Sequence, residues 1–315
     1  MGTHRYSLLE SGDLVIEVAD ALRDAVEPWL PLQADVAGAG MPALATIRVR
    51  FDSILPDQRT PERIVLQLGT VTLVETAPSV FAMHGRGGIS GRIMLDGLAS
   101  DVVVRAPLTD DAAADAYSML TLSAAFLLGR SGSVLMHAGA VVDPAGRAWL
   151  LVGDSHSGKT TTCASLIDVG WCYLADDQVV LRRGANGAID VEGWPRIAHL
   201  DEGWDDREVR NARVAVDLRE RWGDQLRRSA TLGGVLLPAV HRTAPTMATA
   251  AHPAEVFAAL VRQSPWLMAD GMGAPVIASL LGDIAGHPSY QLSLGEDSYA
   301  SGTVLSAALV TAWTA

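Results

Sequence analysis

Residues 153–160 read Gly-Asp-Ser-His-Ser-Gly-Lys-Thr and match the pattern G-x-x-x-x-G-K-[ST] at every defined position. Apolar residues over 147–152 predict a strand before this stretch, and the pattern over 158–169 predicts a helix after it. The two glycines let the backbone curl, so that successive N–H groups point at phosphate oxygens. The stretch therefore predicts a phosphate-binding loop and, with it, a nucleotide such as ATP.

Every residue of this loop is a candidate for nucleotide binding. Lys159 supplies a full positive charge to the β- and γ-phosphates, and the hydroxyl of Thr160 can bind Mg²⁺. The N-terminus of the following helix adds its positive dipole end. The predicted nucleotide-binding residues are Gly153, Asp154, Ser155, His156, Ser157, Gly158, Lys159, Thr160 and Thr161.

Two adjacent acids, Asp176 and Asp177, follow the next predicted strand, over 172–175. In a tight β-loop-α-β unit, that strand end lies beside the phosphates. One carboxylate can hold Mg²⁺ while the other accepts a proton from an attacking hydroxyl; which acid takes which role stays open. His137 lies on a predicted strand over 134–142, whose following turn leads to the strand before the loop. We therefore expect His137 near the γ-phosphate.

These segments resemble a known family. The stretch 136–162, which opens with Met-His-Ala-Gly, and the stretch Leu-Ala-Asp-Asp over 174–177 are similar to the core of HPr kinase/phosphorylase. They are more similar still to shorter HPr-kinase-related proteins, and ATP-dependent phosphoenolpyruvate carboxykinase shares the layout. The resemblance implies a P-loop α/β fold of the HPr-kinase/PEP-carboxykinase type. It places at the metal and the transferred phosphoryl group His137, Lys159, Thr160, Asp176 and Asp177.

The segment over 191–197 contains two further candidates for the predicted site. The resemblance implies that Glu192 approaches the metal, which makes the predicted metal ligands Thr160, Asp176, Asp177 and Glu192. Arg196 can neutralise the transferring phosphate or hold the substrate. The alternative for both residues is a turn with ordinary surface charges.

The predicted activity is transfer of the γ-phosphoryl group of ATP to a hydroxyl, with Mg²⁺ as cofactor. The resemblance favours a serine of a peptide or protein as acceptor. A small-molecule alcohol or sugar is the close alternative, and a nucleotide-binding switch that transfers nothing is a third. The resemblance does not reach the regulatory domain of the true HPr enzyme, so neither HPr itself nor phosphorylase activity is predicted. A homo-oligomer is the assembly that the family suggests, and the oligomeric state stays open.

The pattern along the chain predicts two domains. Residues 1–109 form a smaller strand-rich α+β domain that selects the substrate or partner, and residues 110–315 form the nucleotide-binding catalytic domain. A helix over 110–128 opens the second domain. The glycine-rich stretch over 85–91 has no helix after it, so a hairpin turn is predicted there. The remaining predicted elements of the first domain are strands over 13–18, 46–51, 64–74 and 92–95 and a helix over 19–30.

The C-terminal part adds alternating strands and helices whose apolar spacing indicates core packing. A charged segment over 201–228 contains Trp204 and Trp222, and it is either a surface helix that these tryptophans anchor or a mobile lid or substrate-facing element. The predicted strands cover 235–240 and 290–294, and the predicted helices cover 254–263, 274–285 and 299–313.

Composition narrows the class of protein. The chain has 315 residues, is 49% hydrophobic and carries a formal net charge of −12. This acidic balance argues against binding of nucleic acid or of an anionic membrane, since both require clustered Lys and Arg. Two cysteines, without neighbouring ligands at metal spacing, argue against a disulfide framework or a zinc site. The N-terminus has no apolar signal-peptide core, and we expect a cytoplasmic protein.

Overall fold

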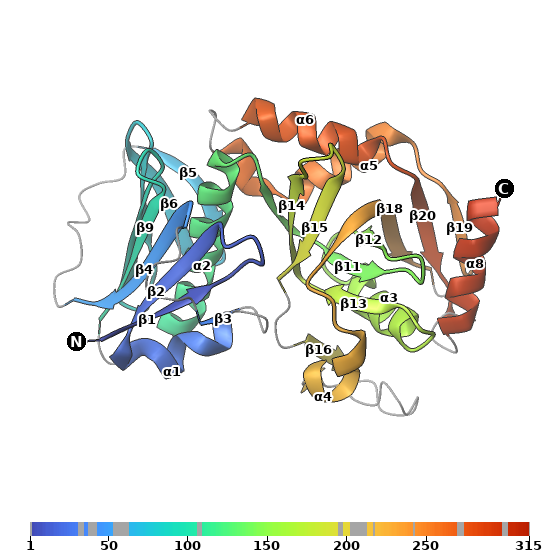
Figure 1. The fold of residues 1–315 in the computed structure, drawn as a ribbon, viewed down its shortest axis with the longest axis horizontal. Coiled ribbons are helices and arrows are strands. Elements are labelled where there is room, and N and C mark those ends of the chain that lie inside the picture. Colours follow the sequence, from blue (N-terminus) through green and yellow to red (C-terminus); the bar gives the residue numbers. More distant parts are fainter. Residues whose placement is uncertain are drawn as a thin grey trace. The chain divides into compact units, whose positions relative to one another are not determined.

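The computed structural model describes residues 2–30, 35–36, 43–52, 63–105, 109–194, 198–201, 213–216, 218–241, 243–269, 274–297 and 302–314. These residues form a mixed α/β architecture with two large mixed sheets (Figure 1). They divide into two compact units. The first unit contains Met1–Leu135 and Pro265–Ile277, and the second contains Met136–Ser264 and Ala278–Ala315.

The first unit is built on one sheet, which has nine strands within the described residues. The strand order is β3-β1-β2-β4-β9-β8-β7-β6-β5. The neighbours β2, β4 and β9 run parallel, and the other neighbours are antiparallel. The strands are β1 (Thr3–Ser7), β2 (Leu14–Ala19), β3 (Asp35–Val36), β4 (Ala45–Phe51), β5 (Ile64–Leu68), β6 (Val71–Ala77), β7 (Val80–His84), β8 (Ile89–Met94) and β9 (Ala99–Val104).

Two predicted elements of this unit are divided in the structure. The single strand predicted over 64–74 is the hairpin β5–β6, because Gly69 adopts a φ of +58° and turns the chain so that Leu68 faces Val71. The helix predicted over 19–30 consists of three short turns, in which Pro28 lacks the N–H that a continuous helix needs. These turns are η1 (Asp20–Leu22), α1 (Arg23–Val26) and η2 (Glu27–Trp29).

The glycine-rich stretch over 85–91 is a hairpin, which confirms the prediction. It joins the antiparallel strands β7 and β8, with Met83 opposite Gly91. The buried carboxylate of Asp115 accepts hydrogen bonds from the amides of Arg86 and Gly87. A carboxylate of the protein thus already accepts the hydrogen bonds that these two amides could donate to a phosphate. This loop is therefore a structural turn.

Helix α2 (Asp110–Arg130) belongs to the first unit. The hydroxyl of Thr109 accepts a hydrogen bond from the amide of Ala112 and caps its first turn, at 3.2 Å. The helix packs on β8 and β9 (Figure 1), and Phe126 meets the edge of Phe81 with ring centroids 5.0 Å apart. The domain boundary predicted at 109/110 assigns this helix to the C-terminal domain, whereas in the structure the helix belongs to the same compact unit as the N-terminal sheet.

The second unit is built on the other large sheet, with the order β10-β14-β15-β18-β12-β11-β13 and with β20 pairing both β18 and β19. The parallel strands β12, β18 and β20 end at one edge of this sheet. The strand predicted over 134–142 is divided at Ala138 into two strands. The strands are β10 (Val134–His137), β11 (Gly139–Val142), β12 (Arg147–Leu151), β13 (Cys172–Ala175), β14 (Gln178–Arg183), β15 (Ile189–Gly193), β18 (Ser229–Val240), β19 (Met247–Ala250) and β20 (Ser289–Leu294).

The predicted helices of the C-terminal part are present with small shifts at their ends. Helix α3 packs on β11 and β13, and α8 packs on α3 and β19. Trp222 of α4 is buried and stacks on Tyr173 with ring centroids 6.0 Å apart, so this tryptophan anchors α4, while Trp204 lies outside the described residues. The elements are α3 (Lys159–Ile167), α4 (Leu218–Trp222), η3 (Gly223–Gln225), α5 (Pro253–Arg262), η4 (Pro265–Met268), α6 (Ala274–Ala285), α8 (Gly302–Thr314) and the strand pair β16 (Ala198–Asp201) and β17 (Arg213–Val216).

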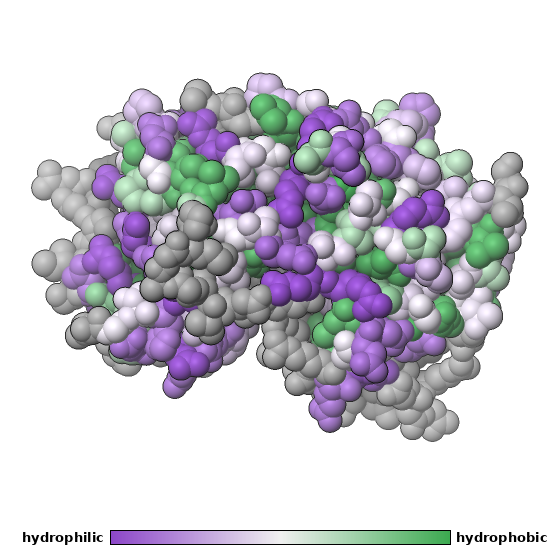
Figure 2. All heavy atoms as spheres, viewed as in Figure 1, coloured by the Kyte–Doolittle hydropathy of each residue, from purple (hydrophilic) through white to green (hydrophobic). Residues whose placement is uncertain are grey.

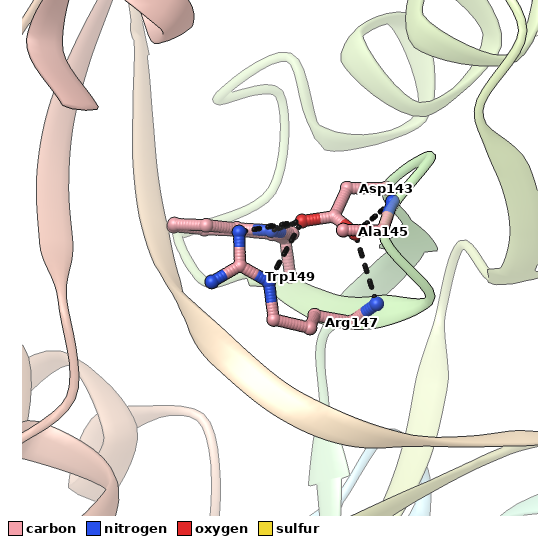
Figure 3. A network of polar contacts seen from close by, with 4 residues as sticks. All are labelled: Asp143, Ala145, Arg147 and Trp149. Atoms are coloured by element: carbon pink, nitrogen blue, oxygen red, sulfur yellow. Dashed lines mark hydrogen bonds and ion pairs between the residues drawn. The ribbon is translucent and has the colours of Figure 1, made fainter. Parts of the chain in front are cut away.

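A buried carboxylate holds the turn between β11 and β12. Asp143 accepts hydrogen bonds from the amides of Ala145 and Arg147 and from the indole N–H of Trp149 (Figure 3), each at 2.9 Å. The guanidinium of Arg147 adds an ion pair at 3.2 Å. Trp149 in turn stacks on Trp313 of α8, with ring centroids 4.8 Å apart. This network fixes the strand that leads into the predicted phosphate loop.

Most of the large hydrophobic side chains in the described residues are buried in the cores of the two units. Figure 2 shows hydrophilic residues over much of the face in view, with smaller separate hydrophobic areas between them. The large hydrophobic side chains that are exposed come from different elements, among them Ile64 of β5, Met247 of β19 and Val310 of α8. None of the helices within the described ranges combines the length and the hydropathy that a membrane span requires.

Candidate nucleotide and phosphoryl-transfer site

The predicted phosphate loop connects strand β12 to helix α3, which confirms the strand–loop–helix arrangement. The amide of Val152 donates to the carbonyl of Leu236 on β18, at 2.9 Å, and ties the start of the loop to the parallel strands. Gly158 adopts a φ of +98° immediately before α3. This backbone conformation favours glycine, and a Cβ atom there would lie 2.6 Å from Leu294 Cδ1, so the end of that side chain would have to shift.

The N-terminus of α3 is open to an anion. No side chain of the described residues caps it, and its first helical hydrogen bond runs from the amide of Thr162 to the carbonyl of Gly158, at 2.8 Å. The amides of the first turn therefore have no partner within the helix and carry its positive dipole end. His156 is exposed and adopts a φ of +66°, so a second left-handed residue curls the same loop. This backbone can cradle a phosphate group.

Lys159 lies folded back onto the loop. Its ammonium donates to the carbonyls of Gly153, at 2.7 Å, and Asp154, at 3.1 Å. Burial lowers the pKa of Lys159, while the charges of Asp177 and, more weakly, of other acidic groups act in the opposite direction. A cation that is desolvated in this way attracts a phosphate more strongly than an exposed lysine does.

His137 and Asp177 are brought together. His137 ends strand β10, and its Nδ1 atom lies 3.1 Å from Oδ1 of Asp177, in the bend after β13. Both side chains are about one third exposed, at 35% and 39%, so the pair is accessible to a ligand. An Nδ1 atom that carries a proton can donate to the carboxylate at this distance and orient it. The expectation that the histidine and the acids lie close together is met for this pair.

Asp176 has a different partner from its neighbour. The hydroxyl of Tyr173 donates to Oδ1 of Asp176 at 2.7 Å. Burial raises the pKa of Tyr173 well above 10, and the Asp176 carboxylate adds to this effect, so the phenol stays a hydrogen-bond donor at neutral pH. The two acids are therefore not equivalent: one is oriented by a histidine and the other by a buried tyrosine.

The remaining residues of the predicted loop and of the first turn of α3 differ in how far they are buried. Ser155 is exposed, while Thr160 and Thr161 are half-buried in the first turn of α3. The hydroxyl of Ser157 is buried and has no hydrogen-bond partner among the described residues; a Cβ atom on Gly153 would lie 2.7 Å from it. Cys163 is a buried residue of helix α3, and a Cβ atom on Gly139 would lie 3.1 Å from its sulfur, so its side chain packs closely against β11.

Glu192 and Arg196 are not joined to this group by any described contact. Glu192 is buried on β15, and its Oε2 atom lies 3.4 Å from Nη1 of Arg182 on β14, so its charge is neutralised there. Arg196 lies outside the described residues. Among the residues that the structure describes, no group of three or more His, Cys, Asp or Glu side chains is arranged to hold a metal ion. The metal ligands thus stay a prediction.

Sequence reasoning missed two residues that support the site. Tyr173 holds Asp176, and Gln263 contacts both Asp154 and the backbone of His137. A tyrosine on an apolar strand reads as core, and Gln263 lies 109 residues from Asp154. Neither contact has a local sequence signal, because both depend on the tertiary fold.

Comparison with known proteins gives little further information. No protein-family model and no curated protein matches the sequence. Among solved structures, the chain is similar to the HPr(Ser) kinase/phosphatase from Coxiella burnetii, with 12% identity and a TM-score of 0.32. The similarity covers 56% of this chain and 97% of that one. At this level, the similarity fixes neither the detailed fold nor the activity of this chain.

Proposed function

We propose that this chain is a kinase that transfers the γ-phosphoryl group of ATP to a hydroxyl. The observation that carries the proposal is the contact between His137 and Asp177, at 3.1 Å, in the same unit as a phosphate loop whose Lys159 interacts electrostatically with Asp177 and Asp176. A loop for nucleotide binding alone does not need an oriented carboxylate of this kind. The acid–histidine pair supports chemistry at the end of the phosphate chain.

Each residue of the site has a role in this proposal. The loop amides and the α3 N-terminus bind the phosphates, and the Lys159 ammonium stabilises the negative charge on them. Asp177, oriented by His137, accepts the proton of the acceptor hydroxyl as its oxygen attacks the γ-phosphorus. The bond from the γ-phosphorus to the bridging oxygen breaks, and ADP leaves. Asp176, held by Tyr173, is then available to bind the metal.

The residues present fit Mg²⁺. The hydroxyl of Thr160 and the carboxylate of Asp176 are hard oxygen donors, and both side chains are partly exposed. Mg²⁺ is usually held by one or two carboxylates together with substrate phosphates and water, so no cage of three acids is required. When bound, the ion would neutralise charge on the phosphate oxygens. Glu192 is already paired with Arg182, so we leave it out of the proposed ligand set.

For the acceptor, we propose a serine hydroxyl of a peptide or protein, as the sequence resemblance suggests. A small-molecule alcohol or sugar is the alternative. The nine-stranded sheet of the first unit is a separate compact structure, which suits it to select the acceptor while the second unit binds the nucleotide.

The proposal predicts that Asp177→Asn abolishes transfer without abolishing nucleotide binding. The amide keeps the shape of the side chain but cannot accept the proton, so the rate should fall by about 10²–10⁴-fold. We would measure the transfer of labelled phosphate from ATP to water, to serine peptides and to a set of alcohols. Calorimetry would give the Kd for ATP. The Kd should change by less than about threefold, because Asp177 is not part of the loop.

Asp283→Asn is the matched control, since Asp283 on helix α6 forms an ion pair with Arg183 and has no described contact with the site. This variant should keep full activity. Transfer that survives Asp177→Asn would contradict the proposed base. A wild-type chain that binds ATP but transfers phosphate to none of these acceptors would favour the nucleotide-dependent switch instead.

A further inference from the structure

We infer that Gln263 is a positioning residue, which ties the phosphate loop to the strand end that carries His137. The inference rests on the proposed function, in which both of these elements act on the same phosphate chain. It concerns a residue far from the loop in sequence, immediately after helix α5.

Gln263 makes two hydrogen bonds to these elements, one as a donor through its side chain and one as an acceptor through its backbone. Its side-chain Nε2 donates to Oδ1 of Asp154 in the loop, at 3.0 Å, and its carbonyl oxygen accepts from the amide of His137, also at 3.0 Å. The residue is only 8% exposed, and its own amide donates to Ala259 within α5, at 3.2 Å. The end of α5 therefore holds the loop and the histidine strand in a fixed register.

The contact at Asp154 matters because of its charge. Asp154 follows the first glycine of the loop, and a free carboxylate there would repel an incoming phosphate. Its carbonyl also accepts from the amide of Ser157, at 3.2 Å, and from the Lys159 ammonium, so the curl of the loop depends on this residue. The Gln263 amide donates to the carboxylate without adding a full charge that would compete with Lys159. Gln263 thus fixes the direction in which the carboxylate points.

Gln263→Leu tests this role, because it keeps approximately the same volume and removes the donor. We expect the Kd for ATP to rise about tenfold, the loss typical of a hydrogen bond to a charged group. Gln263→Glu should weaken binding further, since two carboxylates would then face each other. Gln291→Leu is the matched control: Gln291 also donates to a carboxylate, that of Glu255 at 3.4 Å, in an exposed contact in the same unit. This control should leave the Kd unchanged.

A double-mutant cycle separates positioning from general destabilisation. If Gln263 acts through Asp154, then Gln263→Leu should change the Kd by less than about twofold in the Asp154→Ala background. An equal loss in both backgrounds would overturn the inference.

Hydrogen exchange in the absence of nucleotide provides a readout that does not depend on ATP. Gln263→Leu should speed amide exchange in the loop, while the amide of His137, which donates to the main-chain carbonyl of residue 263, and helix α5 stay protected. Unchanged exchange would also overturn the inference. If the wild-type chain binds no ATP, the proposed function fails, and the exchange experiment still decides whether Gln263 positions the loop.

Discussion

The backbone at Gly158 has a φ of +98°, and the side chain of Leu294 occupies the place where a Cβ atom would point. The first condition alone disfavours every L-residue, and under the second condition an added Cβ atom would require the end of the Leu294 side chain to shift. Both conditions apply at the residue from which α3 starts. Gly158 therefore contributes to the shape of the predicted phosphate loop.

Gly158→Ala should consequently damage both stability and binding. We expect the free energy of unfolding to fall by about 1–2 kcal/mol from the backbone alone, and more from the contact with Leu294. The affinity for ATP should fall more than about tenfold, because the loop amides no longer converge. Urea denaturation and calorimetry with ATP would measure the two effects.

Gly146→Ala is the control for this prediction. Gly146 has a similar φ of +81° and lies in the turn before β12, but no atom of the described residues lies within 4 Å of the place that its Cβ atom would take. The backbone cost should remain, and the affinity for ATP should not change. Equal affinities in the two variants would refute the claim that Gly158 shapes the binding loop.

Individual residues also show how far sequence reasoning reached. The loop from Gly153 to Thr160 could be predicted because its chemistry is local, with glycines and a lysine at fixed spacing. The proximity of His137 and Asp177 followed from the resemblance and from the expected strand order. The contact of Gln263 with Asp154 could not be predicted, because it depends on where helix α5 ends relative to the loop.

At the scale of elements, the hairpin β11–β12 depends on one buried acid. Asp143 has a side chain only 2% exposed, and it accepts from two amides and one indole besides the Arg147 ion pair. Asp143→Ala would leave these donors buried without a partner. We expect the free energy of unfolding to fall by about 3 kcal/mol, as measured by urea denaturation.

Arg147→Ala removes only the guanidinium of the same network, which is 53% exposed. Since an exposed ion pair contributes little, this variant should lose less than about 1 kcal/mol. A larger loss for Arg147→Ala than for Asp143→Ala would show that the ion pair, and not the buried hydrogen bonds, stabilises the turn.

The types of the elements were predictable, while some of their boundaries were not. Strand β13 and helix α6 have the predicted bounds because their apolar patterns begin and end sharply. The stretch over 64–74 has a continuous strand composition, and only the backbone conformation at Gly69 divides it. The sheet orders join strands far apart in the chain, so they could not be read from local patterns.

At the scale of the molecule, the chain passes between the two units three times, at 135/136, 264/265 and 277/278. The segment Pro265–Ile277 completes the first unit, where η4 packs on α2 and the indole N–H of Trp266 donates to the carbonyl of Leu135, at 2.8 Å. A segment near the C-terminus thus covers part of the core formed by the N-terminal residues.

Trp266→Ala should destabilise the first unit specifically. Trp266 is 5% exposed, and loss of a buried ring of this size costs about 3–5 kcal/mol. Hydrogen exchange of the full chain should show faster exchange in α2 and less change in α3. Trp266→Phe keeps most of the ring and should cost about half as much. Unchanged exchange in α2 would contradict the assignment of this segment to the first unit.

The return of the chain to its first unit has a consequence for synthesis on the ribosome. The first 135 residues emerge long before the segment that completes their core, because all of Met136–Ser264 is translated in between. At ~5–20 residues per second, this interval is on the order of ten seconds. During that time, the side of α2 that η4 later covers is open to solvent and to chaperones. The nascent first unit can therefore reach its final packing only after most of the second unit has been made.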